Sequence, residues 1–92
     1  MKIFQATVLA NTEVFETAVA KAFEGHHLKV ADNVWLLADT GTAQEVCAKL
    51  GMPITPGVRS PFSAMVVGVS GYYGWVGSNI WEWIAAKQAV DA

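Results

Sequence analysis

The sequence predicts a single α+β domain over residues 1–92, with the order strand, helix, strand, strand, helix, strand, helix. Three observations predict this class. Apolar residues alternate with a period of two in some segments and recur at helical spacing in others. Glycine and proline separate these segments. The length of 92 residues fits one domain, and the chain contains no repeat of domain scale.

The first two elements are a strand and a helix. Residues 2–10 alternate loosely and carry β-branched and aromatic side chains, which is typical of a half-buried strand. We expect Thr12 to cap a helix over residues 13–24, and Gly25 to end it in a left-handed conformation. The apolar stripe of this helix consists of Phe15, Val19, Ala22 and Phe23.

A hairpin is predicted next, with strands at residues 26–31 and 34–39 joined by a tight turn at Asp32-Asn33. Direct pairing about this turn defines two faces. The first face consists of Leu28, Val30, Trp35 and Leu37. The second face consists of Lys29, Ala31, Val34 and Leu36. The first face is richer in large apolar residues, so we expect it to meet the helices.

The remaining elements complete a recognisable plan. Thr42-Ala43-Gln44-Glu45 is a capping box that starts a short helix, which Gly51 closes. Residues 63–70 are predicted to form the fourth strand, and Ser78 or Asn79 caps a last helix. With right-handed crossovers, the βαββαβ order gives a ferredoxin-like, four-stranded antiparallel sheet with two helices on one face. The additional C-terminal helix is expected at an edge or over the open face.

Three short segments carry a resemblance to a known family. They are Asn33-Val34-Trp35-Leu36-Leu37, Thr42-Ala43-Gln44-Glu45-Val46 and Lys49-Leu50-Gly51. They resemble small ferredoxin-like proteins related to the CRISPR-associated adaptation nuclease, and the order of elements is similar over residues 1–75. The resemblance implies a dimer and a metal-dependent nuclease. The metal-binding aspartate of that family lies at the end of the first strand, where this chain has Ala10-Asn11.

The composition predicts association. Hydrophobic residues make up 53% of the chain and charged residues only 15%, against a usual charged fraction of about 25%. A domain of this length has a thin core, so it cannot bury all of its apolar surface. We therefore expect a homo-oligomer, most simply a dimer, or a protein partner that covers an apolar face.

Charge and cysteine content disfavour several other classes. The six basic residues are scattered and the net charge is −2, so nucleic-acid binding is disfavoured. Residues 60–81 carry no charge but are too rich in glycine, serine and asparagine for a membrane span. Cys47 is the single cysteine, which fits a reducing, cytoplasmic setting.

Few side chains suit catalysis or metal binding. The adjacent His26 and His27 point to opposite faces of a strand and cannot chelate one metal together. Cys47 has no base beside it in sequence and is expected to pack in the core. An acid–base pair remains open if Asp39 faces Asn11 or Glu45 across the sheet edge. We predict no catalytic residue, metal or cofactor.

The best candidate site is a glycine-rich aromatic loop with Tyr72, Tyr73 and Trp75, in which glycine recurs at every third position from 68 to 77. One interpretation is a bulged strand end followed by turns. The other is a flexible loop that presents three aromatic side chains to a partner or flat ligand. Together with Arg59, these aromatics could also hold a nucleotide by stacking and charge.

Trp81 and Trp83 form a second candidate site. They lie about 160° apart on the last helix at ~100° per residue, so both cannot join the stripe of Ile80 and Ile84. Either this helix lies between two layers, or one tryptophan marks an interface; the interface is favoured.

These features favour a non-enzymatic small binding protein that acts through protein–protein contacts. Small acidic domains with surplus aromatic residues are often regulators or inhibitors, including phage-borne antagonists of host defence. Two alternatives stay open. One is the metal-dependent nuclease that the resemblance implies, and the other is a small-ligand protein that binds a nucleotide.

Overall fold

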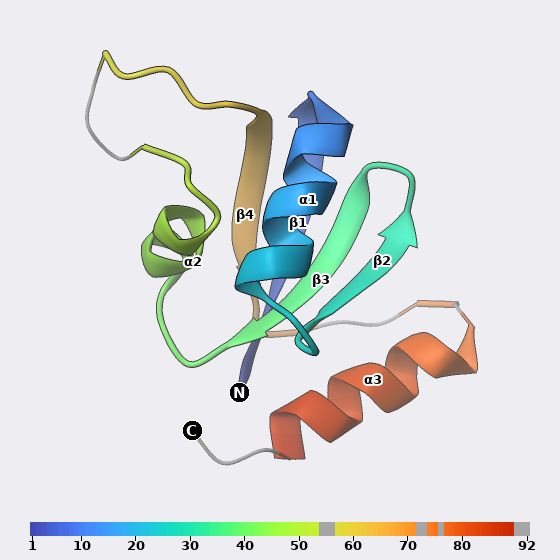
Figure 1. Cartoon of the computed structure of the whole chain (residues 1–92). Helices are drawn as coiled ribbons and strands as arrows, with labels where there is room; N and C mark the ends of the chain where they lie inside the picture. Colours follow the sequence, from blue (N-terminus) through green and yellow to red (C-terminus); the bar gives the residue numbers. More distant parts are fainter. Residues whose placement is uncertain (54–56, 72–73, 76, 90–92) are drawn as a thin grey trace.

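The computed structural model describes residues 1–53, 57–71, 74–75 and 77–89. Four strands and three helices follow one another in the predicted order (Figure 1). The strands are β1 (Lys2–Ala10), β2 (His27–Ala31), β3 (Val34–Asp39) and β4 (Ser63–Val69). The helices are α1 (Thr12–Ala22), α2 (Ala43–Lys49) and α3 (Ser78–Ala89). The structure thus confirms the α+β class and the type of every predicted element.

The strands form one antiparallel sheet in the order β2-β3-β1-β4. The central strand β1 pairs with β3 on one side and with β4 on the other. This arrangement leaves β2 and β4 as the two edge strands. Because β1 carries buried side chains toward both faces, the sheet has a core on each side.

The larger core lies between the sheet and helices α1 and α2 (Figure 1). Phe15 of α1 is fully buried there, with its ring centre 4.9 Å from that of Trp35 and 5.2 Å from that of Phe62. Val19 of α1 and Val46 of α2 are buried in the same cluster. The predicted stripe of the first helix therefore meets the sheet through Phe15, Val19 and Phe23, whereas its fourth member, Ala22, is exposed.

The smaller core lies on the opposite face, under α3. Ile84 of α3 is buried against Ile3, Leu36 and Ala38. In Figure 1, α3 crosses near the end of the sheet where the chain begins and leaves the other end bare. The last helix therefore packs over the sheet face opposite α1 and α2, one of its two predicted places. Within the described residues, no helix combines the length and apolar character needed to cross a membrane.

The predicted faces of the hairpin are wrong, because a β-bulge lies at Val30. The register shifts between Lys29 and Ala31, so Lys29 pairs with Trp35 and Leu28 pairs with Leu36. An extra residue on one strand reverses which side chains share a face. Leu28 and Val30 consequently pack in the core beneath α3, whereas Trp35 and Leu37 pack against α1 and α2.

The helix ends confirm two predictions and correct two. Thr42 and Glu45 form the capping box, and Gly51, which has a positive φ angle, directly follows the C-cap of α2. The C-cap of α1 is Phe23, so Gly25, although its φ angle is positive, lies beyond the end of the helix. The N-cap of α1 is Asn11 and not Thr12. Asn11 adopts a left-handed conformation, with φ 58°, and its side chain does not cap the helix. Asparagine tolerates this conformation better than most residues.

Candidate functional site

The aromatic loop is only partly within the described residues. Trp75 is fully exposed, while Tyr72 and Tyr73 lie outside the described residues. An exposed tryptophan is available to a partner, because aromatic side chains bury much area at a small entropic cost. The position of Trp75 alone does not distinguish a binding loop from a turn.

Arg59 lies far from that loop. It is exposed in the connection between α2 and β4, whereas Trp75 follows the other end of β4 (Figure 1). The seven residues of β4 separate these two segments, a distance of roughly 20 Å at about 3.3 Å per residue. The described residues therefore do not bring Arg59 and Trp75 together in one nucleotide pocket.

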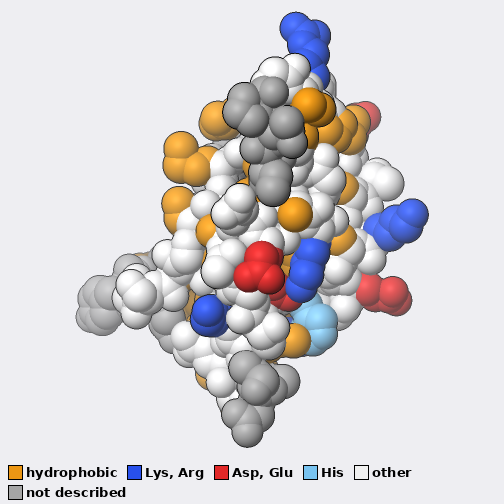
Figure 2. All heavy atoms as spheres, turned by 90° about the vertical axis from the view of Figure 1, so that its left-hand side faces the viewer, with side chains coloured by type: hydrophobic (Ala, Val, Ile, Leu, Met, Phe, Trp, Pro, Cys, Tyr) orange, Lys and Arg blue, Asp and Glu red, His pale blue; other side chains and the backbone are white. Residues whose placement is uncertain are grey.

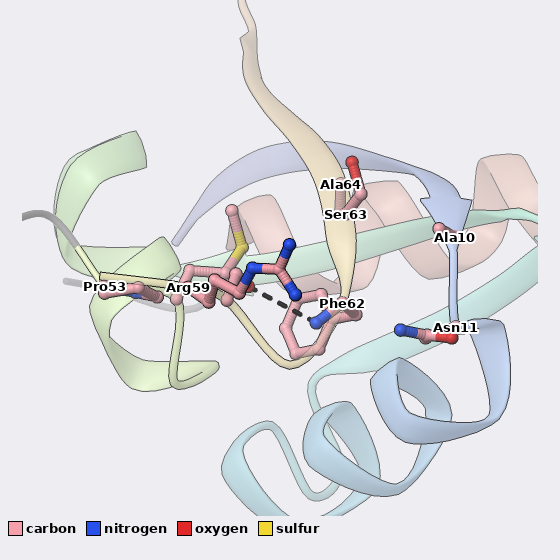
Figure 3. Close-up of a pocket in the computed structure, with 9 residues that line it drawn as sticks. Ala10, Asn11, Pro53, Arg59, Phe62, Ser63 and Ala64 are labelled. Atoms are coloured by element: carbon pink, nitrogen blue, oxygen red, sulfur yellow. Dashed lines mark hydrogen bonds between the residues drawn. The ribbon is translucent and has the colours of Figure 1, made fainter. Parts of the chain in front are cut away.

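A shallow hollow of about 610 Å³ does adjoin Arg59 (Figure 3). Asn11 lines it and donates a hydrogen bond from Nδ2 to the Pro61 carbonyl oxygen at 3.1 Å. The Phe62 backbone N–H lies 3.4 Å from Ser60 Oγ, which accepts from it. The bond from Asn11 ties the end of β1 to the segment before β4, and the bond to Ser60 lies within that segment. The hollow offers a guanidinium, an amide and hydroxyls, but no paired acid and base.

Trp81 and Trp83 are both half-buried on α3. Both pack against the cluster of Ile3, Leu36, Ala38 and Ile84. The Lys87 ammonium also lies 6.0 Å from the centre of the Trp83 ring. Each tryptophan thus contributes to holding α3 on the sheet and keeps part of its surface exposed.

The end of α3 is tethered to the loop before β2. Lys87 Nζ donates a hydrogen bond to the Gly25 carbonyl oxygen at 2.6 Å. The same ammonium lies 3.3 Å from Nδ1 of His26, which accepts from it. These contacts join residues more than sixty positions apart. They place α3 over β2, β3 and the first half of β1.

The remaining part of that sheet face is uncovered, and we call it the open face. Register places Met65 opposite Thr7 and Val67 opposite Gln5, and residues directly opposite share a face. Met65 is 61% exposed and Val67 is 44% exposed. In Figure 2, which looks from the side of β4 and α2, hydrophobic side chains gather along one border of the view. The open face consists of Gln5, Thr7, Met65 and Val67, none of which carries a charge.

The orientation of β4 is the reverse of what core packing alone would favour. Its smaller residues Ala64 and Val66 pack toward α1 and α2, while the larger Met65 points to the uncovered side. An exposed methionine and valine stabilise the monomer less than they would if buried. Their placement leaves an exposed, uncharged apolar surface on this side of the sheet. The sequence predicts a strand here but does not single out Met65 and Val67. The alternation in SAMVVGV places these two residues on the same face of the strand.

The carboxylate of Asp39 has structural partners. Asp39, at the end of β3, is buried and accepts a hydrogen bond of 2.6 Å from Lys49 Nζ and one of 3.1 Å from the Gly41 N–H. Burial opposes ionisation of Asp39, but these bonds and the charge of Lys49 prevail and hold its pKa below the usual value. Asp39 pairs with Lys2 in the sheet. The predicted encounter with Asn11 is wrong, because Asn11 lies at the other end of β1.

Cys47 and the acidic groups show no arrangement for nucleophilic or metal chemistry. Burial raises the pKa of the Cys47 thiol, which keeps it protonated at neutral pH. Within the described ranges, no three side chains of the His, Cys, Asp and Glu types lie close enough to bind one metal ion.

The fold and this surface define a small α+β domain with a half-covered sheet. No family model matches the chain, and no curated protein or solved structure shows significant similarity to it.

Proposed function

We propose that this chain is a non-enzymatic, ferredoxin-like binding protein that acts through protein–protein contacts made by its open face. One observation carries the proposal: Met65 and Val67 are exposed side by side on a sheet half that α3 leaves bare. A role as a regulator or inhibitor fits a small domain whose distinctive feature is a contact surface. Its free thiol at Cys47 suits the cytoplasm.

The chemistry of the open face supports a protein as the ligand. Two apolar side chains lie beside the amide of Gln5 and the hydroxyl of Thr7. Interfaces between proteins combine an apolar centre that is poor in charge with polar groups that hydrogen-bond across it. A nucleic acid would instead require clustered cations, and the open face has none.

The ionisable side chains of the molecule support binding over catalysis. Asp39 is engaged with Lys49, and the Cys47 thiol has a raised pKa. A general base or a nucleophile needs a perturbed group that is free to meet a substrate. Neither side chain meets that description.

Site-specific photo-crosslinking tests the proposal. A photoreactive amino acid at Thr7, in the centre of the open face, should give a discrete adduct with another protein in cells that express the chain. The same amino acid at Ala20, which is exposed on α1, should give none. The measurement is the mass and identity of each adduct after denaturing electrophoresis.

Two results would contradict the proposal. One is the same set of adducts from positions 7 and 20, which would show that the open face has no special role. The other is turnover of DNA or RNA by the purified chain with magnesium or manganese, the activity that the resemblance implies.

A further inference from the structure

The two edges of the sheet differ in how they are protected. On β2, Lys29 is exposed. Its ammonium lies 3.1 Å from a carboxylate oxygen of Glu16 and 5.3 Å from the centre of the Trp35 ring. A bulge also interrupts the pairing of β2 with β3 at Val30. Charged side chains and bulges are the features that stop an edge strand from pairing with another chain. The β2 edge is therefore blocked.

The β4 edge carries no such feature on its own strand. Ser63–Val69 contains neither a charged residue nor a proline, and the register shift in its ladder lies on β1, between Val8 and Ala10. Among the described residues, backbone hydrogen bonds outside helices and strand ladders involve no residue of this strand. Alternate backbone groups of an edge strand point away from its single neighbour. On β4 these donors and acceptors point outward next to Met65 and Val67.

We infer that β4 pairs with β4 of a second copy of this chain, antiparallel and about a twofold axis at Val66. The two four-stranded sheets then become one continuous sheet. This inference deepens the proposed function and rests on it, because it makes the outer border of the open face part of an interface between two copies.

The register follows from the symmetry. Val66 is the middle residue of β4, so it lies opposite itself in the second copy. Met65 then lies opposite Val67 of the second copy, and Ala64 opposite Gly68. Directly opposite side chains have Cβ atoms about 5 Å apart and share a face. Two Met65–Val67 pairs therefore form one apolar cluster across the seam.

A second copy fits this edge for two reasons. First, the strand is complementary to itself, since twofold pairing brings apolar residues together and places no charges opposite each other. Second, the protected β2 edge cannot extend the sheet further, so assembly stops at two copies. Such a dimer also accounts for the apolar excess of the sequence.

A pair of charge variants tests the register. Met65→Lys and Val67→Glu should each weaken self-association by about tenfold or more, because each places an unpaired charge in the apolar seam. An equimolar mixture should restore the dimer, since Lys at 65 of one chain then faces Glu at 67 of the other. Val14→Lys adds the same charge at an exposed apolar residue of α1, away from the open face and the seam, and should leave the dimer intact.

Light scattering coupled to size-exclusion chromatography measures the mass. The inference expects twice 9.9 kDa for the unaltered chain and for the mixture, and a shift toward one chain for each variant alone. A mass of one chain at every concentration of the unaltered protein overturns it, as does a mixture that fails to re-form dimers. Adducts with a different protein at position 7 would still support the proposed function in either case.

Discussion

At the scale of single residues, the ion pair between Asp39 and Lys49 shows how one contact joins two elements. It ties the end of β3 to α2 through an aspartate side chain that is only 11% exposed. Replacing Lys49 by Gln should lower the free energy of unfolding by about 1 kcal/mol at neutral pH. Urea denaturation monitored by tryptophan fluorescence measures the difference.

The pH dependence of this difference in the free energy of unfolding identifies its cause. Because the pKa of Asp39 is lowered in the folded state, its stabilising contribution is present above the unfolded pKa and is lost as the pH falls through the folded value. The gap between the unaltered chain and Lys49→Gln should therefore narrow below about pH 5. Lys21→Gln removes an exposed lysine that joins no ion pair of the described residues and should show no such gap. A gap that is constant down to strong acid would refute this role for Asp39.

At single residues, the features with a local cause could be predicted from the sequence, and those that depend on distant residues could not. The capping box of Thr42 and Glu45 is a local pattern with a local cause, and it was predicted correctly. No local pattern predicted the bulge at Val30, whose neighbours in the core under α3 come from distant parts of the chain. Asn11, and not Thr12, is the N-cap, and its side chain donates a hydrogen bond to Pro61, fifty residues away.

At the scale of elements, α3 is held on the sheet by its apolar face and by a lysine near its end. Lys87 supplies the tether to Gly25 and His26. Lys87→Met should loosen the end of α3 and raise hydrogen exchange of its backbone amides, with little change in exchange of β1 and β3. Helix ends with exposed hydrogen bonds open locally at small free-energy cost. Hydrogen exchange followed by mass spectrometry makes the comparison.

A second variant controls for the replacement of a charged side chain of α3 by methionine. Glu82 lies on α3 and is exposed, so Glu82→Met alters the same helix without touching the tether. Faster exchange of α3 in Lys87→Met but not in Glu82→Met would support the tether. Equal exchange in the two variants would mean that Trp81, Trp83 and Ile84 hold the helix without it.

The helices and strands could be predicted from the sequence, but the part of the sheet that α3 covers could not. Periodicity located β4 and α3 to within a residue or so, because alternation and helical spacing are local. Which half of the sheet α3 covers depends on contacts between distant segments, such as Ile84 with Ile3. The predicted aromatic sites therefore came from composition, whereas the exposure of Met65 and Val67 emerged only from the fold.

At the scale of the whole molecule, we expect the difference between the two edges to limit the inferred assembly to two copies. If Lys29 helps to keep β2 from pairing, Lys29→Val should open a second edge. A copy with one self-complementary edge closes at two copies. A copy with two edges able to pair can go on adding further copies. The variant should therefore form species heavier than the dimer, and their mass should rise with concentration in light scattering.

Lys21→Val makes the same chemical change on α1, away from both edges, and should keep the mass of the unaltered chain. Circular dichroism and thermal melting of both variants separate ordered assembly from misfolding, since the pair of Lys29 with Glu16 is exposed and its loss costs little stability. A folded Lys29→Val chain that stays dimeric would mean that the bulge at Val30 alone blocks the β2 edge. In that case the limit on assembly is set by backbone geometry, and charge has no part in it.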